Sequence, residues 1–226
     1  MNVRLVSYSQ PTEEFRHSGI EDAQDLIAFC ARVSNPSNQF NTETSEKLIR
    51  YLVRNKHWSP LEMVSACLEI TTTRDIARQI LRHRSFSFQE FSQRYADPTK
   101  DLSFVLREAR LQDTTNRQNS IELGESIEDS VLREEWIRQQ EEVLQAARRA
   151  YTWAINKGIA KEQARAVLPE GLMESRLYMN GSLRSWIHYC ELRSAHGTQK
   201  EHIEIAKAIA KVISVGFPMM NEFCND

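Results

Sequence analysis

Strict alternation of apolar and polar residues marks the clearest predicted strand, at residues 63–73. Val64, Ala66, Leu68 and Ile70 fall on one side of an extended chain, and the residues between them are mostly polar. This pattern is typical of a strand with one buried face. Shorter β-type runs accompany it at residues 3–7, 102–106 and 172–180.

Apolar residues at helical spacing predict several helices around these strands. In residues 182–194, Leu183, Trp186, Ile187 and Cys190 lie on one helical face. The same spacing predicts helices at residues 21–33, 43–55, 160–167 and 199–215, and another that follows the capping residue Thr73.

A much longer helix is predicted from about residue 125 to residue 157, with Gly158 ending it. The polar, turn-rich residues 112–124 before it are the one segment that resembles a linker. A helix of this length indicates packing between subunits or an outlying arm. Together the elements predict an α+β fold, with a small central sheet and several helices, as a single domain of residues 1–226.

Composition narrows the class of protein. The 226 residues are 41% hydrophobic and 27% charged, with a net charge of -2, which is ordinary for a soluble domain. There is no run of 18 apolar residues, and residues 1–10 lack the features of a signal peptide. The four cysteines are far apart in the sequence. We therefore expect a cytoplasmic protein with reduced thiols and no membrane contact.

A local excess of positive charge lies between residues 74 and 94. Five arginines stand there against two acids, which indicates one bound anion on a mildly acidic chain. Arginine forms two-bond contacts with phosphate. A solvated basic helix end is the structural alternative. A nucleic-acid-binding module is another, but a pI near 6.3 and the lack of a recognisable binding fold argue against it.

The spacing within this segment is more specific than its charge. Arg82-His83-Arg84, seven further residues and then Ser92 resemble the RHR-x7-S signature of the flavin-dependent thymidylate synthases. The similarity extends on both sides of the signature, to Gln79, Glu90, Arg94 and Tyr95.

Three other segments resemble the same family, so the resemblance spans most of the chain. Residues 57–62 (HWSPLE) are similar to H-x-(S/T)-P-x-E, residues 164–169 (ARAVLP) to A-R-x-V-L-P, and residues 182–193 to the family's late helix. Each has a structural explanation when taken alone. Arg165 can favour a helix dipole, Arg184 and His188 can be solvated, and Arg193 can snorkel.

The resemblance implies reductive methylation of deoxyuridylate (dUMP) to thymidylate (dTMP). Methylenetetrahydrofolate supplies the carbon, and FAD reduced by NADPH carries the hydride. It also implies a homotetramer with shared active sites, and neither a metal nor a nucleic-acid partner. A flavin- or nucleotide-binding protein without methylation activity remains an alternative.

Site residues follow by resemblance, one position at a time. The FAD-binding positions are Ser59, Arg82, His83, Arg84, Glu90, Ser182, Arg184 and His188. The dUMP-binding positions are Gln79, Arg82, Glu90, Phe91, Ser92, Gln93, Arg94, Arg165 and Arg193. His57 and Gln89 are assigned to folate.

Arg193 matches the family's catalytic arginine, which stabilises the ionised uracil N3. No cysteine lies in a cationic setting that would make it a nucleophile, and Ser92 is interpreted as a ligand contact. His196 and His202 match nothing in the family pattern. They lack metal-site spacing, and we predict that both are surface residues.

Overall fold

Four antiparallel strands form the central sheet. The computed structural model describes residues 1–224 and gives the strand order β1 (Asn2–Tyr8), β2 (Ser65–Thr73), β6 (Glu174–Ser182) and β3 (Ser87–Glu90). β2 pairs with β6 along the full length of both strands. The strands predicted at 3–7, 63–73 and 172–180 are therefore confirmed, with ends shifted by one or two residues.

The alternation in β2 produces a sheet with one buried face. Leu68 and its partner Met179 on β6 are fully buried. Glu69 lies on the opposite face, where its carboxylate accepts hydrogen bonds from Arg4 at 2.6 Å and Tyr178 at 2.8 Å. Polar side chains thus pair with one another across the face that carries no helices.

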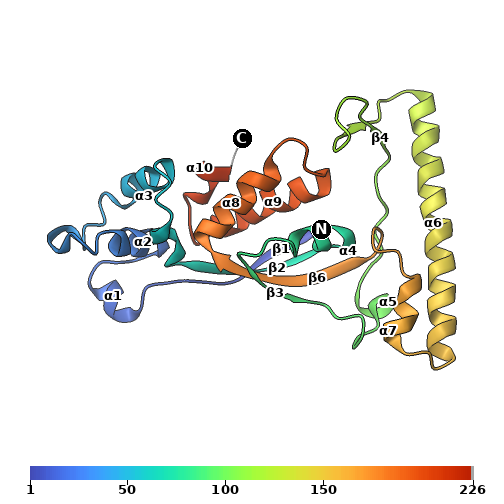
Figure 1. The fold of residues 1–226 in the computed structure, drawn as a ribbon, viewed down its shortest axis with the longest axis horizontal. Helices are drawn as coiled ribbons and strands as arrows, with labels where there is room; N and C mark the ends of the chain where they lie inside the picture. Colours follow the sequence, from blue (N-terminus) through green and yellow to red (C-terminus); the bar gives the residue numbers. More distant parts are fainter. Residues whose placement is uncertain (225–226) are drawn as a thin grey trace.

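Helices cover the apolar face (Figure 1). α8 (Leu183–Ser194) and α9 (Lys200–Ile213) pack on the sheet, α10 (Met220–Cys224) packs on α8 and α9, and α4 (Arg74–Ile80) follows β2 directly. Thr73 is the N-cap residue of α4, as predicted, but its hydroxyl bonds to Asp75 and not to a backbone N–H. At one end of the sheet lie α1 (Glu13–His17), α2 (Ala23–Ala31), the 3₁₀ turn η1 (Pro36–Asn38), α3 (Ser45–Arg54) and the 3₁₀ turn η2 (Ser59–Glu62).

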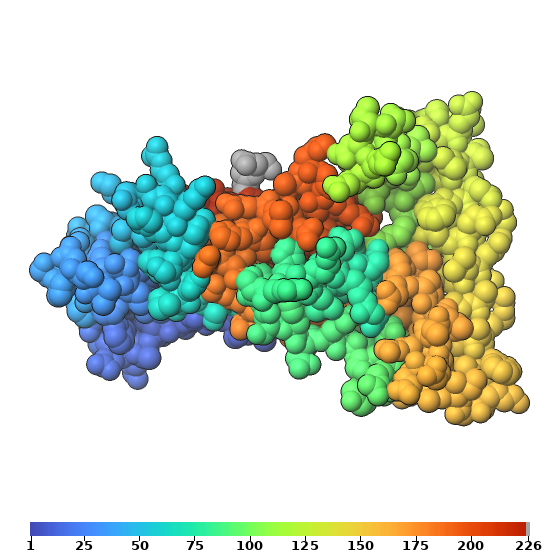
Figure 2. All heavy atoms as spheres, viewed as in Figure 1, coloured from blue at the N-terminus to red at the C-terminus, as the bar shows by residue number. Residues whose placement is uncertain are grey.

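The predicted long helix is α6 (Ile127–Asn156), at the opposite end of the molecule from α1 to α3 (Figure 2). Gly158 has a φ of 77° just after it, the left-handed conformation expected of a helix-ending glycine. α6 packs on α7 (Lys161–Ala164) and η3 (Arg165–Val167), and α5 (Pro98–Asp101) lies nearby. A second apolar cluster holds this end together: Tyr151, Ala154, Ala164, Leu168 and Met173.

Two predictions about the segment before α6 were wrong. Residues 102–106 form no strand; Phe104 makes only an isolated bridge to Met173. Residues 112–124 are not a plain linker either, because β4 (Arg110–Gln112) and β5 (Ser120–Glu122) pair as a hairpin. Asp113 holds the turn of this hairpin through side-chain bonds to Thr115, Asn116 and Asn119. Each strand has only three residues, with one exposed apolar side chain (Leu111 or Ile121), which is too short for an apolar alternation to reveal a strand in sequence.

Residues 1–224 contain no helix that is both long and apolar enough to cross a membrane. The four cysteines are all free thiols; Cys190 and Cys224 are buried, and Cys30 and Cys67 are half-buried.

Candidate active site

The RHR motif occupies the turn between α4 and β3. The His83 backbone N–H donates to the Ile80 carbonyl at 3.0 Å, which extends the last turn of α4 into the motif. His83 is half-buried, whereas Arg82 and Arg84 are exposed. Within residues 1–224, neither arginine has an acidic side chain as a hydrogen-bond or ion-pair partner, so their charge remains available for an anion.

Arg193, near the end of α8, contacts the centre of this motif. Its Nε–H donates to Nε2 of His83 at 2.9 Å, so His83 accepts there and carries its proton on Nδ1. Burial, then the charges of Arg193 and Arg82, lower the pKa of His83 to about 4. His83 is therefore neutral near pH 7. Within residues 1–224, neither Nη group of Arg193 has a hydrogen-bond or ion-pair partner, so both are available to a ligand.

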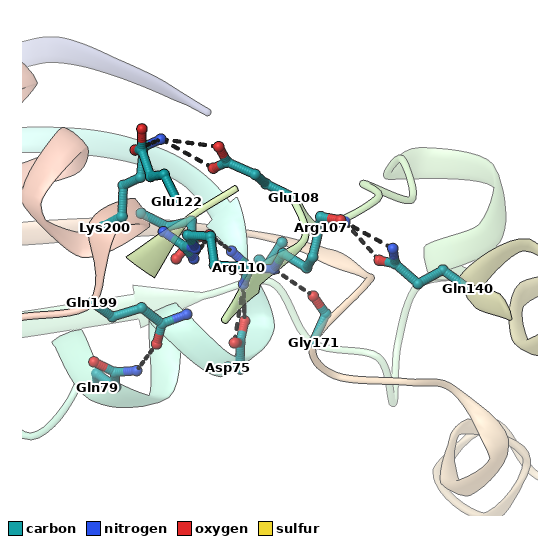
Figure 3. A network of polar contacts seen from close by, with 12 residues as sticks. Asp75, Gln79, Arg107, Glu108, Arg110, Glu122, Gln140, Gly171, Gln199 and Lys200 are labelled. Carbon is teal, nitrogen blue, oxygen red and sulfur yellow. Dashed lines mark hydrogen bonds and ion pairs between the residues drawn. The ribbon is translucent and has the colours of Figure 1, made fainter. Parts of the chain in front are cut away.

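His202 is fully buried, so the prediction that it is a surface residue was wrong. Its Nε2 lies 2.8 Å from the Tyr189 hydroxyl, and its Nδ1 lies 3.2 Å from Oε1 of Gln79. Gln79 in turn donates to Gln199 at 2.9 Å, just before α9 (Figure 3). His196, by contrast, is exposed as predicted.

The aromatic ring of Tyr189 connects the two histidines. Its edge-to-face contact with His83 has a centroid distance of 4.8 Å, while its hydroxyl reaches His202. Gln79, His83, Tyr189, Arg193 and His202 thus form one continuous contact network, which we call the histidine network. It joins α4, α8 and α9 beneath the RHR motif.

A second group of predicted residues lies around the start of α8. Ser182 is the N-cap, and its Oγ accepts from the Ser185 N–H at 3.3 Å. Arg184 forms an ion pair with Glu62 of η2, the 3₁₀ turn that Ser59 begins. His188 is exposed, with the ring of Trp58 packed edge-to-face at 4.3 Å.

A third group joins the segment after β3 to the end that carries α6. Arg94 pairs with Glu162 of α7 at 3.1 Å, and Nε of Arg165 donates to the backbone carbonyl of that same Glu162 at 3.3 Å. Ser92 Oγ accepts from the Arg94 N–H at 3.3 Å. Arg94 and Arg165 therefore meet at Glu162, the first through its carboxylate and the second through its backbone carbonyl, and Ser92 bonds to the backbone of Arg94.

The remaining predicted residues make contacts inside the protein. Glu90 accepts from Ser175 at 2.8 Å and pairs with Arg74 at 3.4 Å. Gln93 is buried, with its amide 3.1 Å from the Met173 sulfur, so its side chain is occupied internally. The Phe91 N–H donates to the Arg176 carbonyl at 2.8 Å and continues the pairing of β3 with β6.

Gln199 also lines a cleft of about 740 Å³ between the β4–β5 hairpin, α6 and the start of α9. Next to the cleft-lining Arg110, Arg107 pairs with Asp75 at 2.7 Å (Figure 3). Arg107 also pairs with Glu201 at 3.3 Å. Arg110 bonds to Glu201 at 2.5 Å. The sequence does not reveal this cluster, because isolated charges carry no periodic signal.

The RHR motif and the residues around the start of α8 fit an anionic, planar cofactor such as FAD. The unpaired Arg82 and Arg84 offer forked donors of the kind that bind a pyrophosphate. At the start of α8, the partly exposed pair of Trp58 and His188 offers aromatic surface for a ring system.

Comparison with known proteins identifies the family. The model of the family described as thymidylate synthase complementing protein matches residues 16–219. A flavin-dependent thymidylate synthase from Synechocystis is 48% identical over 96% of each chain. A probable flavin-dependent thymidylate synthase from Paramecium bursaria Chlorella virus 1 is 44% identical, also over 96% of each chain.

A solved structure has the same fold. The UMP/dUMP methylase PolB from Streptomyces cacaoi, bound with 5-Br dUMP, superimposes with a TM-score of 0.80 at 25% identity. The superposition covers 98% of this chain and 93% of that one. Since the family model and both relatives span nearly the whole sequence, this chain belongs to the flavin-dependent thymidylate synthase family.

Proposed function

We propose that the protein catalyses the reductive methylation of dUMP to dTMP, with methylenetetrahydrofolate as carbon donor and FAD reduced by NADPH. The observation that carries this proposal is the contact between Arg193 and His83 of the RHR motif, beside two unpaired arginines, in a chain of this family. The names of the relatives and the dUMP analogue on the structural neighbour support it.

FAD is proposed to lie along Ser59, Arg82, His83, Arg84, Glu90, Ser182, Arg184 and His188. When bound and reduced, it supplies the hydride that completes the methyl group. Arg84 has the clearest role among these positions, since it is exposed and unpaired within residues 1–224. Arg184 already pairs with Glu62, so a phosphate there competes with a carboxylate.

Arg193 is proposed as the catalytic residue. His83 holds its Nε, which leaves the Nη donors for O2 and N3 of uracil. A fixed positive charge there stabilises the N3 anion and increases electron density at C5, the atom that attacks the folate carbon. Because arginine stays protonated, it stabilises the ionised ring and does not remove the proton.

The dUMP phosphate is proposed to bind Ser92, Arg94 and Arg165. A dianion that enters this group replaces the single carboxylate of Glu162 as the partner of Arg94. Gln79 is proposed to contact the base or sugar through the part of its amide that Gln199 leaves free.

We further propose that the chain assembles into a homotetramer with shared active sites. Seven large apolar side chains of α6 are at least 41% exposed: Ile127, Val131, Leu132, Trp136, Ile137, Val143 and Trp153. So much exposed apolar surface on one element is typical of a protein–protein interface.

The first test is the visible absorption spectrum of the purified protein, before and after incubation with FAD and desalting. We expect a retained flavin band that shifts when dUMP is added. UMP is the matched control that tests recognition of the sugar, because the structural neighbour is named as a methylase of both UMP and dUMP. Absence of a band under both conditions would exclude the proposal.

Two variants separate the flavin from the methylation step. Arg193→Ala should abolish dTMP formation, by at least about 100-fold, and keep its flavin band, since its proposed partner is uracil. Arg84→Ala should lose flavin on desalting. Turnover that survives in Arg193→Ala would instead favour a flavoprotein without this methylation mechanism.

A further inference from the structure

His202 interrupts the apolar face of α9. Its neighbours on that face, Ile205, Ala206 and Ile209, are buried hydrophobic residues, and His202 is equally inaccessible. A buried imidazole is costly unless both ring nitrogens are hydrogen-bonded. Both are bonded here, to residues of two other helices.

The two bonds define the tautomer of His202. Oε1 of Gln79 is an amide oxygen and can only accept, so Nδ1 of His202 carries the proton. Nε2 then has a lone pair, and it accepts from the Tyr189 hydroxyl. The hydrogen bonds in this part of the histidine network therefore run in one direction: Tyr189 donates to His202, and His202 donates to Gln79.

The bond from His202 fixes the orientation of the Gln79 side-chain amide. With its oxygen turned toward His202, its Nε2 donates to Gln199, and its second N–H has no partner within residues 1–224. If the bond from His202 is lost, the amide can rotate by 180° and exchange its oxygen and nitrogen. A ligand that accepts from the free N–H would then meet an oxygen.

We propose that His202 is a positioning residue for nucleotide binding, which orients the side-chain amide of Gln79 as a donor toward the substrate. This inference rests on the proposed function, because the substrate in question is dUMP. His202 itself is fully buried, so it acts through Gln79. Tyr189 supports it by fixing the tautomer, and the ring of Tyr189 also contacts His83 beside Arg193.

Two amide variants separate orientation from general packing. In His202→Asn the amide nitrogen takes the place of Nδ1 and keeps the donor to Gln79. In His202→Gln the amide oxygen takes the place of Nε2 and keeps only the acceptor for Tyr189. Each variant loses one bond, so their melting temperatures should fall by similar amounts.

The measurement is the dUMP dissociation constant of the flavin-loaded protein, from the change in its absorption spectrum or by calorimetry. We expect His202→Asn to bind dUMP within about twofold of wild type. His202→Gln should bind about tenfold more weakly, the equivalent of one hydrogen bond to the ligand. In a Gln79→Ala background, the same His202→Gln change should alter binding less than twofold.

Equal dUMP affinities for the two amide variants would overturn the inference, as would a His202→Gln effect that persists without Gln79. Both outcomes leave the proposed function intact, because the wild type still binds dUMP. If the flavin-loaded wild type binds no dUMP, the proposed function fails and this inference fails with it.

Discussion

Two neutral histidines surround the charge of Arg193. Burial, with the nearby arginine charge, lowers the pKa of His83 to about 4 and that of His202 to about 3. Neither ring adds a positive charge near pH 7, and neither neutralises the guanidinium as a carboxylate would. The positive charge of Arg193 thus remains available for an anionic ring, which is what stabilisation of a uracil anion requires.

The same burial predicts a pH dependence of stability. A histidine in the unfolded chain takes up a proton near pH 6.5, whereas His202 in the folded protein does so only near pH 3. The unfolded state therefore binds more protons between these values, and the free energy of unfolding falls as the pH falls below 6.5. The limiting slope for one histidine is about 1.4 kcal/mol per pH unit.

Urea denaturation of wild type and His202→Asn between pH 7.5 and 4.5 measures this effect. Asparagine does not titrate and keeps the bond to Gln79, so the variant should lose less stability than wild type as the pH falls. Parallel curves for the two proteins would show that His202 does not resist protonation in the folded state.

At the scale of elements, β6 and the RHR turn meet at Gly181. A Cβ atom there would lie 2.4 Å from the ring of Phe86, which follows the RHR motif closely in sequence. Phe86 also packs edge-to-face on the buried Trp186 at 4.6 Å. Because Gly181 has no side chain, Phe86 can pack against β6, and this packing brings the RHR motif close to the start of α8.

Gly181→Ala should therefore destabilise the protein by about 1–3 kcal/mol, because Phe86 must move out of a well-packed position. The displacement should also weaken flavin retention, since the RHR turn moves with Phe86. Gly171→Ala is the matched control, since a Cβ atom at that glycine meets nothing within 4 Å. Thermal unfolding and desalting with FAD measure both effects; equal behaviour of the two variants would contradict the role of the close approach.

The elements differ in how well the sequence predicts them. β2 and α6 are identified by long periodic patterns, and the four family segments carry local similarity. The β4–β5 hairpin is not predicted from the sequence. Its stability comes from the Asp113 turn and from ion pairs with α9, and neither produces a periodic pattern. The burial of His202 is not predicted for a related reason. Its partners Tyr189 and Gln79 lie on other helices, and no local sequence pattern links them to His202.

At the scale of the whole molecule, the proposed site residues lie in separate places of one chain. Arg193 belongs to the histidine network, which joins α4, α8 and α9, whereas Arg94 and Arg165 meet at Glu162 at the end that carries α6 (Figure 1). A shared site in an assembly would bring Arg94 and Arg165 of one subunit, the proposed phosphate ligands, to Arg193 of another. The exposed apolar residues of α6 offer a surface for such an assembly.

Mixed assemblies of two inactive variants test this arrangement. Arg165→Ala and Arg193→Ala, co-expressed with different tags and purified through both, should regain activity, because some sites combine an intact Arg165 with an intact Arg193 from a neighbouring subunit. Random mixing leaves about a quarter of the sites complete in a symmetric assembly.

The matched control combines His83→Leu with Arg193→Ala. His83 and Arg193 touch within one chain, so mixing these two variants cannot restore their contact, and the mixture should stay inactive. If the Arg165→Ala and Arg193→Ala mixture were equally inactive, both arginines would serve the site of a single chain. In that case a movement within one subunit would have to bring Arg165 to Arg193, and the exposed apolar surface of α6 would serve something other than assembly of the site.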